Sequence, residues 1–204
     1  MDFDFKGEHI LENEIVRLRP LVIEDFGLLL EFSTNEPTIW KYNIGGADGI
    51  ENLKIYIENA VNQRYNEREY PFIVFDKIAN KYVGSTRFYD FQFKRKTVEI
   101  GYTWYGKDYQ GTGINKNCKF LMLDFAFEYL DMDRVGFRAN SKNDRSINAM
   151  KSLGCTVEGI LRSFNFDASG QRLDAVVLSI LKSEWDMDLR DRLKNKISQA
   201  GPSM

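Results

Sequence analysis

The sequence has 204 residues but only one histidine, two cysteines and four prolines. The single histidine, His9, excludes a zinc pattern of two cysteines and two histidines, and we expect no metal site. The two cysteines, Cys118 and Cys155, cannot make a disulfide framework and are typical of a reducing compartment. If the protein is an acid–base enzyme, we therefore expect its proton carriers to be carboxylates, tyrosines, lysines or water.

Several motifs and segments are also absent. The hydrolase motif G-x-S-x-G and the glycine-lysine-Ser/Thr of a P-loop do not occur. No apolar run approaches the roughly 18–20 residues of a membrane span, and the start, MDFDFKGEH, lacks the apolar core of a secretory signal. The net charge is −2, with acids and bases interspersed. We therefore expect a cytoplasmic protein without nucleic-acid or membrane partners.

What is present is the pattern of a single globular domain, with a core over about residues 15–185 and a C-terminal helix over about 183–197. Alternating apolar and polar residues predict seven strands: Ile15–Leu21, Tyr70–Asp76, Tyr82–Phe91, Thr97–Trp104, Arg134–Asn140, Thr156–Asp167 and Leu173–Leu181. Helical periodicity and capping signals predict five helices: Glu24–Ser33, Ile50–Glu67, Ile114–Leu130, a short helix from Asn143 or Asp144 to Gly154, and Ser183–Ile197.

The order of these elements predicts the fold class. Three consecutive strands over residues 70–104 form an antiparallel meander, and one strand–helix–strand unit follows as a parallel crossover. We therefore expect an α/β fold with a mixed, mostly antiparallel seven-stranded sheet and helices on both faces. In the third meander strand, alternation places Val98, Ile100, Tyr102 and Trp104 on one face. The opposite face then carries Glu99, Gly101 and Thr103.

The loop KDYQGTGINKN joins this strand to a helix and carries two glycines, Gly111 and Gly113. A glycine-rich turn that enters a helix exposes unpaired backbone N–H groups and the positive end of the helix dipole, which suits a phosphate or pyrophosphate. Lys107, Lys116 or Lys119 could add charge from the rim. A plain turn is the alternative. A dinucleotide fingerprint is disfavoured because Lys116 stands at its third glycine.

The stretch QGTGIN resembles the pyrophosphate loop Q/R-x-x-G-x-G/A of the GNAT superfamily of N-acetyltransferases. Gln110 and Gly113 match, and Asn115 replaces the final small residue. Further stretches resemble the RimJ/RimL-type branch: VRLRPLVIEDF, VGSTRF, VEIGY, NDRSINAMKSLGC, and EGILR followed by DAVVLSI. Cys155 replaces the usual aromatic residue after Gly154. The resemblance covers about residues 15–185 and implies direct transfer of acetyl from acetyl-CoA to a primary amine in a ternary complex.

The resemblance also implies where acetyl-CoA binds. The third meander strand and the strand from Arg134 should separate after the loop, with the pantetheine arm between them. Its partners would be the backbone of Tyr102, Thr103 and Trp104. The pyrophosphate would lie on the loop residues Gln110, Gly111, Thr112, Gly113, Ile114 and Asn115. Asn143 would contact the pantetheine arm, unless it only caps its helix.

For the chemistry, Glu99 is the first candidate for a general base, acting through water, and Glu158 is the second. A surface or ion-paired glutamate is the alternative for both. The tyrosine that many superfamily members carry after the asparagine is absent, and Ser146 is expected to stabilise the leaving thiolate instead. Cys118 fits the apolar core of its helix better than a role as nucleophile.

The acceptor is a small-molecule amine or a protein N-terminus. Five residues are candidates for its pocket, although each also suits the core or the surface: Trp40, Tyr42, Arg87, Tyr89 and Phe164. The sequence leaves a homodimer open. Two other functions stay in view. A catalytically silent CoA-binding module is compatible with the missing tyrosine and with Asn115, whereas a nucleotide-binding regulator is disfavoured by the failed fingerprints.

Overall fold

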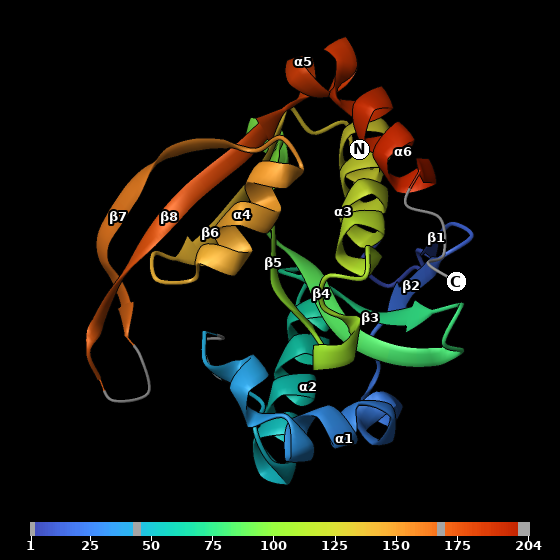
Figure 1. The fold of residues 1–204 in the computed structure, drawn as a ribbon, viewed down its shortest axis with the longest axis vertical. Helices are drawn as coiled ribbons and strands as arrows, with labels where there is room; N and C mark the ends of the chain where they lie inside the picture. Colours follow the sequence, from blue (N-terminus) through green and yellow to red (C-terminus); the bar gives the residue numbers. More distant parts are fainter. Residues whose placement is uncertain (1–2, 43–45, 167–169, 200–204) are drawn as a thin grey trace.

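The computed structural model describes residues 3–42, 46–166 and 170–199. Within them, eight strands form one sheet in the order β1-β2-β3-β4-β5-β6-β8-β7 (Figure 1). The strands are β1 Leu11–Glu12, β2 Val16–Pro20, β3 Tyr70–Asp76, β4 Lys81–Gln92, β5 Thr97–Tyr105, β6 Arg134–Asn140, β7 Thr156–Phe166 and β8 Arg172–Leu181. Seven strands were predicted. The eighth, β1, has only two residues and is too short to show an alternating pattern.

The helices lie where capping and periodicity predicted them. They are α1 Phe26–Asn35, α2 Ile50–Tyr65, α3 Ile114–Asp124, α4 Asp144–Ser152, α5 Lys182–Glu184 and α6 Arg190–Gln199. Short 3-10 turns precede or link several of them: η1 Ile23–Asp25, η2 Pro37–Trp40, η3 Phe93–Arg95 and η4 Lys107–Tyr109. Two predicted helices are interrupted, because α3 continues as the π-helical segment η5 Phe125–Tyr129 and α6 is preceded by the π-helical segment η6 Trp185–Leu189.

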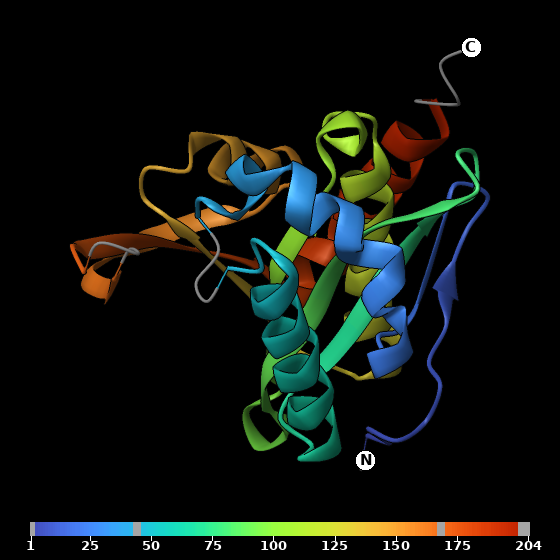
Figure 2. The same ribbon diagram turned by 90° about the horizontal axis from the view of Figure 1, so that it is seen from below.

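The helices cover both faces of the sheet (Figures 1 and 2), as predicted. On one face, α1 and α2 pack over a core that includes Leu29, Leu53, Ile57, Ile73 and Trp104. On the other face, α3, α4 and α6 pack over a larger core that includes Val98, Ile100, Met122, Phe137 and Leu193. The hairpin of β7 and β8 reaches away from the body, and nearly all of β7 is exposed.

Strands β5 and β6 run parallel but pair over a short distance. Their partners are Thr97 with Arg134, Val98 with Val135, and Glu99 with Gly136. Beyond Glu99 the two strands no longer pair, while β6 pairs with β8 along its whole length. The expected separation of these strands is therefore present, and no strand of the described residues pairs with the edge of β5 that faces β6 there.

A bulge in β5 overturns the predicted alternation of its side chains. Tyr102 has a φ of +50°, and the register skips so that Thr86 of β4 lies opposite two residues, Tyr102 and Thr103. As a result, Thr103 turns toward α3, and Trp104 turns toward α1 and α2, where it packs 4.6 Å from the Trp40 ring. The prediction that Glu99 lies on the face opposite Tyr102 and Trp104 is therefore wrong.

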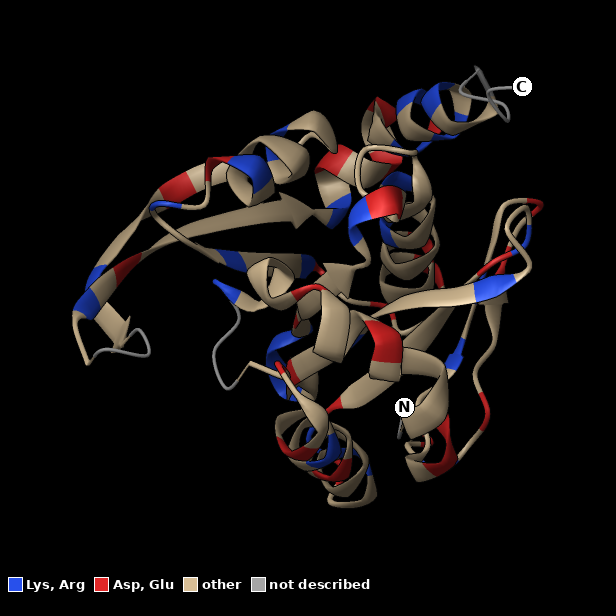
Figure 3. Ribbon diagram, turned by 60° about the horizontal axis from the view of Figure 1, so that its bottom comes forward, with Lys and Arg blue, Asp and Glu red and all other residues tan. Residues whose placement is uncertain are grey.

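Charged side chains are spread over the whole molecule. Basic and acidic side chains both occur along α2 and the β7–β8 hairpin, whereas α6 is mainly basic (Figure 3). In the described residues no helix combines the length and apolar character that crossing a bilayer requires.

Candidate active site

The loop between β5 and α3 has the geometry of an anion site. Gly111 and Gly113 have φ values of +82° and +92°, which disfavour any residue with a Cβ. A Cβ at Gly111 would meet no atom within 4 Å, and one at Gly113 would meet only Asn117 Nδ2, at 4.0 Å. The space beside the loop is thus open, and the glycines are required by the backbone conformation rather than by crowding.

The polar groups of the loop fix its shape without capping α3. Gln110 Nε2 donates to the carbonyl of Tyr105 at 2.8 Å, and Thr112 Oγ1 donates to the carbonyl of Tyr109 at 2.8 Å. Gly113 is the N-cap residue, and it has no side chain to bond the first N–H groups of α3. These N–H groups also have no carbonyl partner within the helix. The loop therefore has unpaired donors suited to a phosphate or diphosphate group.

Helix α4 begins beside this loop. Asn143 caps the helix, since its Oδ1 accepts from the backbone N–H of Ser146 at 3.1 Å. Arg145 contacts Gln110 Oε1 with its Nη1, which joins the start of α4 to the loop. This contact brings the start of α4, which carries Asn143 and Ser146, next to Gln110 of the loop. Arg145 was missed, because a surface arginine in a helix gives no sequence signal for this contact.

The lysines near the loop do not all lie on its rim. Lys107 is exposed and Lys116 is half-buried, as expected for rim positions. Lys119 instead points into the core, with 4% of its surface exposed. Its Nζ lies 2.9 Å from Thr86 Oγ1 and 2.7 Å from Thr103 Oγ1. Of the three lysines considered for a rim charge, Lys119 is therefore excluded, because the face of α3 that carries it packs on the sheet.

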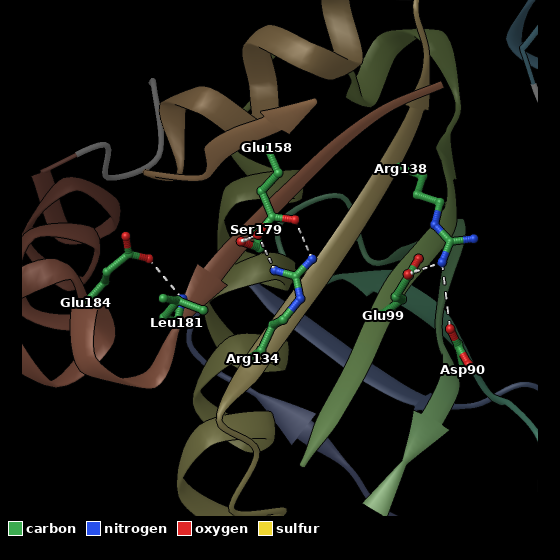
Figure 4. Close-up of polar contacts among 8 residues, drawn as sticks. All are labelled: Asp90, Glu99, Arg134, Arg138, Glu158, Ser179, Leu181 and Glu184. Carbon is green, nitrogen blue, oxygen red and sulfur yellow. Dashed lines mark hydrogen bonds and ion pairs between the residues drawn. The ribbon is translucent and has the colours of Figure 1, made fainter. Parts of the chain in front are cut away.

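Glu99 lies at the point where β5 and β6 separate. It belongs to the last pair of the parallel register, and its side chain is 14% exposed. Tyr89 Oη donates to Glu99 Oε2 at 2.5 Å, and the Arg138 guanidinium contacts Oε1 (Figure 4). Burial and the neighbouring carboxylate raise the pKa of Tyr89, so the phenol stays protonated and donates to Glu99.

Two glycines make room for this pair of side chains. A Cβ at Gly101 would lie 2.7 Å from Tyr89 Cε1, and a Cβ at Gly136 would lie 3.1 Å from Glu99 Cγ. Both strands therefore need glycine for Tyr89 and Glu99 to lie against the sheet. The two glycines serve the site, although they have ordinary strand conformations.

Arg138 of β6 links Glu99 to the hairpin. Its Nη2 lies 3.7 Å from Asp90 Oδ2, and its guanidinium lies over the Phe164 ring at 5.2 Å. The sequence interpretation missed Arg138. The parallel pairing supplies the signal, since Arg138 lies two residues beyond Gly136 and therefore on the same face.

Arg87 adds a second cluster next to the first. It is 4% exposed, pairs with Glu69 at 2.6 Å, and lies between the rings of Tyr56 at 4.9 Å and Tyr102 at 4.2 Å. The ring of Tyr102 in turn lies 5.3 Å from that of Tyr89. Of the five predicted acceptor residues, Arg87, Tyr89 and Phe164 are therefore connected to Glu99 through shared neighbours.

The other two acceptor candidates lie elsewhere. Trp40 is 5% exposed and belongs to the core under α1 and α2, which its sequence position did not reveal. Tyr42 is half-buried, and its described contact is with the Nζ of Lys41, 5.2 Å from its ring centroid. Residues 43–45, which follow Tyr42, lie outside the described residues.

Glu158 lies apart from this cluster. Its carboxylate makes two bonds with Arg134, of 2.8 and 2.7 Å, and accepts from Ser179 Oγ at 2.7 Å. Figure 4 shows this group on one side and Glu99 with Arg138 on the other. The structure does not bring the two candidate bases together. Both cysteines are free and buried, and burial raises the pKa of each thiol to about 12.

Comparison with known proteins gives the same family as the loop. The chain is 25% identical over 176 residues to the uncharacterized N-acetyltransferase p20 of Bacillus licheniformis, covering 86% of this chain and 97% of that protein. It is 35% identical over 95 residues, 47% of this chain and 50% of that protein, to YdaF of Bacillus subtilis (strain 168), which is provisionally named a ribosomal N-acetyltransferase. This similarity is consistent with the RimJ/RimL-type branch.

A solved structure has the same fold, and a family model matches most of the chain. A GCN5-related N-acetyltransferase from Brucella melitensis has the same fold, with a TM-score of 0.85 at 22% identity, over 94% of this chain and 86% of that one. The model of the acetyltransferase (GNAT) domain matches residues 16–156, which include the loop, the bulge and Glu99. The chain belongs to the GNAT family of N-acetyltransferases.

Proposed function

We propose that the protein transfers acetyl from acetyl-CoA directly to a primary amine. One observation carries this proposal. The uncapped start of α3, with its two positive-φ glycines, adjoins the edge of β5 that loses its pairing with β6 after Glu99. Backbone donors for a diphosphate and a free strand edge for an extended amide chain thus lie next to each other.

Different residues of this region would bind different parts of acetyl-CoA. The N–H groups over residues 111–115 would hold the diphosphate, with Gln110 fixing the loop. The backbone of Tyr102, Thr103 and Trp104 would bond the pantetheine arm and polarise the acyl carbonyl. Acetyl-CoA supplies the acetyl group as an activated thioester. Asn143 and Ser146 lie at the start of α4, which Arg145 joins to the loop, and the Ser146 hydroxyl would donate to the leaving thiolate.

Glu99 is the residue best placed to receive a proton. A primary amine must lose its proton before it attacks, and a free α-amino group, with a pKa of about 7.7–8.0, loses it more readily than a lysine, at about 10.4. Glu99 would accept the proton through water, while Tyr89 and Arg138 hold its carboxylate in place. Glu158 remains the second candidate, but it lies on the exposed strand β7, paired with Arg134, and away from the point where β5 and β6 separate.

We further propose a protein N-terminus as the acceptor. The name of YdaF points to ribosomal proteins, and the exposed β7–β8 hairpin beside Arg138 offers a surface for an extended chain. A small-molecule amine is the alternative. We expect the protein to act in the cytoplasm, and a homodimer stays a proposal.

Calorimetric titration with CoA tests the coenzyme site. Gly113→Glu should weaken binding at least tenfold, because a carboxylate would face the diphosphate. Gly27→Glu is the matched control, since Gly27 is exposed on α1 and a Cβ there meets nothing within 4 Å. Asparagine tolerates a positive φ better than most residues, so Gly113→Asn shows how much of the loss of affinity comes from backbone strain alone, without a negative charge. Equal affinity in all three variants would refute this placement.

An acceptor screen tests the reaction. Wild-type protein, acetyl-CoA and a panel of peptides and small amines would be followed by thiol release and by mass spectrometry of the product. We expect acetylation of an N-terminal amine. Tight CoA binding without transfer to any acceptor would instead favour the silent CoA-binding module.

A further inference from the structure

A lysine is buried under the proposed coenzyme site. Lys119 of α3 is 4% exposed, and its Nζ is held by the hydroxyls of Thr86 and Thr103, which also lie 2.7 Å from each other. No carboxylate forms an ion pair with Lys119 in the part of the chain that the structure describes. A buried amine without a counter-ion is costly, and strongly perturbed ionisable groups cluster at functional sites.

The position of the amine connects it to the bulge. Thr103 is one of the two bulged residues of β5, and Thr86 is the residue of β4 that lies opposite them. Lys119, Thr86 and Thr103 therefore join α3, β4 and β5 at the bulge of β5. Lys119 lies five residues after Ile114, about 7.5 Å along α3 from the start of the helix.

The surroundings of the amine contain thiols rather than acids. The ionisable groups that act on Lys119 are Cys118 on the same helix and Cys155 before β7. Asp76 and Glu184 influence the thiols, Asp76 that of Cys118 and Glu184 that of Cys155. Burial lowers the pKa of Lys119 to about 7, so the amine is partly charged at neutral pH.

We propose that Lys119 is a positioning residue of the coenzyme site. Its amine fixes the Tyr102–Thr103 bulge through the hydroxyls of Thr86 and Thr103, and its positive charge attracts the anionic coenzyme from the core side of the sheet. This inference rests on the proposed function, because it takes the gap beside the bulge and the start of α3 as the place where the coenzyme binds. Lys119 acts through Thr103 and through its charge, without touching the coenzyme.

The sign of the pH dependence follows from this role. Below pH 7 the amine is charged and strengthens the binding of an anion, and above pH 7 it becomes neutral and the attraction is lost. For a buried charge about 10 Å from a bound charge, an effective dielectric constant of about 20 gives a change in affinity on the order of tenfold. A residue that only filled space would give an effect independent of pH.

The test is the affinity for CoA of wild type and Lys119→Met between pH 6 and pH 8.5. Methionine keeps the length of the apolar chain and removes the amine. We expect the dissociation constant of the variant to be about tenfold larger than that of wild type at pH 6, where the charge and the threonine bonds are both lost. At pH 8.5 the excess should be clearly smaller, because only the bonds of the neutral amine to Thr86 and Thr103 are then lost. Lys54→Met, a lysine exposed on α2, is the matched control and should give a ratio of one throughout.

Two results would overturn the inference. One is a dissociation constant of Lys119→Met that equals that of wild type at every pH, and the other is a difference between the two constants that does not change with pH. If Lys119→Met does not fold, NMR titration of labelled lysines in the wild type replaces it. Addition of CoA should then raise the pKa of Lys119, and an unchanged pKa would contradict the proposal. If the wild type does not bind CoA at all, the proposed function itself fails.

Discussion

Replacement of Glu99 by glutamine should slow acetyl transfer while leaving the fold and the affinity for CoA nearly unchanged. Glutamine has the shape of glutamate, and its Oε1 can still accept from Tyr89 or Arg138. It cannot take a proton from the amine. Loss of a general base costs about 100- to 10,000-fold in rate, so we expect the turnover number to fall within this range.

The structure limits the side effects of this change. The side chain of Glu99 is 14% exposed and that of Arg138 is 31% exposed, so their ion pair is partly screened. After the substitution, Arg138 keeps Asp90 at 3.7 Å as a partner. The free energy of unfolding should therefore decrease by only about 1 kcal/mol. A much larger loss of stability would show that Glu99 is mainly a structural residue.

Glu158→Gln is the control that decides between the two carboxylates. Glu158 has an exposed ion pair with Arg134, so its replacement should cost at most about 1 kcal/mol. Initial rates over pH 6–9 with the acceptor found by the screen, together with CoA titration, would be measured for both variants. Wild-type rates for Glu99→Gln at every pH, or a large rate loss for Glu158→Gln alone, would refute the assignment of Glu99.

Three further predictions concern buried groups. Arg87→Met should lower the free energy of unfolding in urea by about 3–5 kcal/mol because it leaves Glu69 without its partner, and Arg87→Met combined with Glu69→Gln should lower it less. The pKa of about 12 for both Cys118 and Cys155 means that iodoacetamide at pH 8 should label them only after unfolding. An unfolded chain protonates Lys119 up to higher pH than the folded protein, so from pH 7 to 9 the stability of wild type should rise by about 2 kcal/mol more than that of Lys119→Met. Parallel pH dependences of the two proteins would contradict the low pKa.

Most of the fold could be predicted from the sequence because its signals are local. The strands Tyr70–Asp76 and Arg134–Asn140 have their predicted bounds, and the helix after the loop begins at the predicted residue. Alternation, helical spacing and glycine positions depend on the residues of one segment only. The sequence does not show the interruption of a helix by a π-helical turn, because helical periodicity changes little over five residues.

The site was predictable only in part. The loop was found because positive-φ glycines and helix starts have local signatures. The bulge at Tyr102 was missed, because it depends on the register between β4 and β5, and one inserted residue exchanges the faces of every side chain that follows. Predictions for Thr103 and Trp104 failed for this reason, whereas Val98 and Ile100, which precede the bulge, pack on one face as expected.

The bulge explains why the candidate site residues lie close together. Without it, regular alternation would place Thr103 with Glu99 and put Tyr102 on the opposite face. With it, Tyr102 joins Tyr89 and Arg87 on the α2 side, and Thr103 meets Lys119 on the α3 side. The bulge thus affects both faces of the sheet. It places the Tyr102 ring beside Tyr89, which bonds Glu99, and the Thr103 hydroxyl beside the amine of Lys119. We infer that the local cost of a positive φ at a tyrosine persists because both sides of the site depend on it.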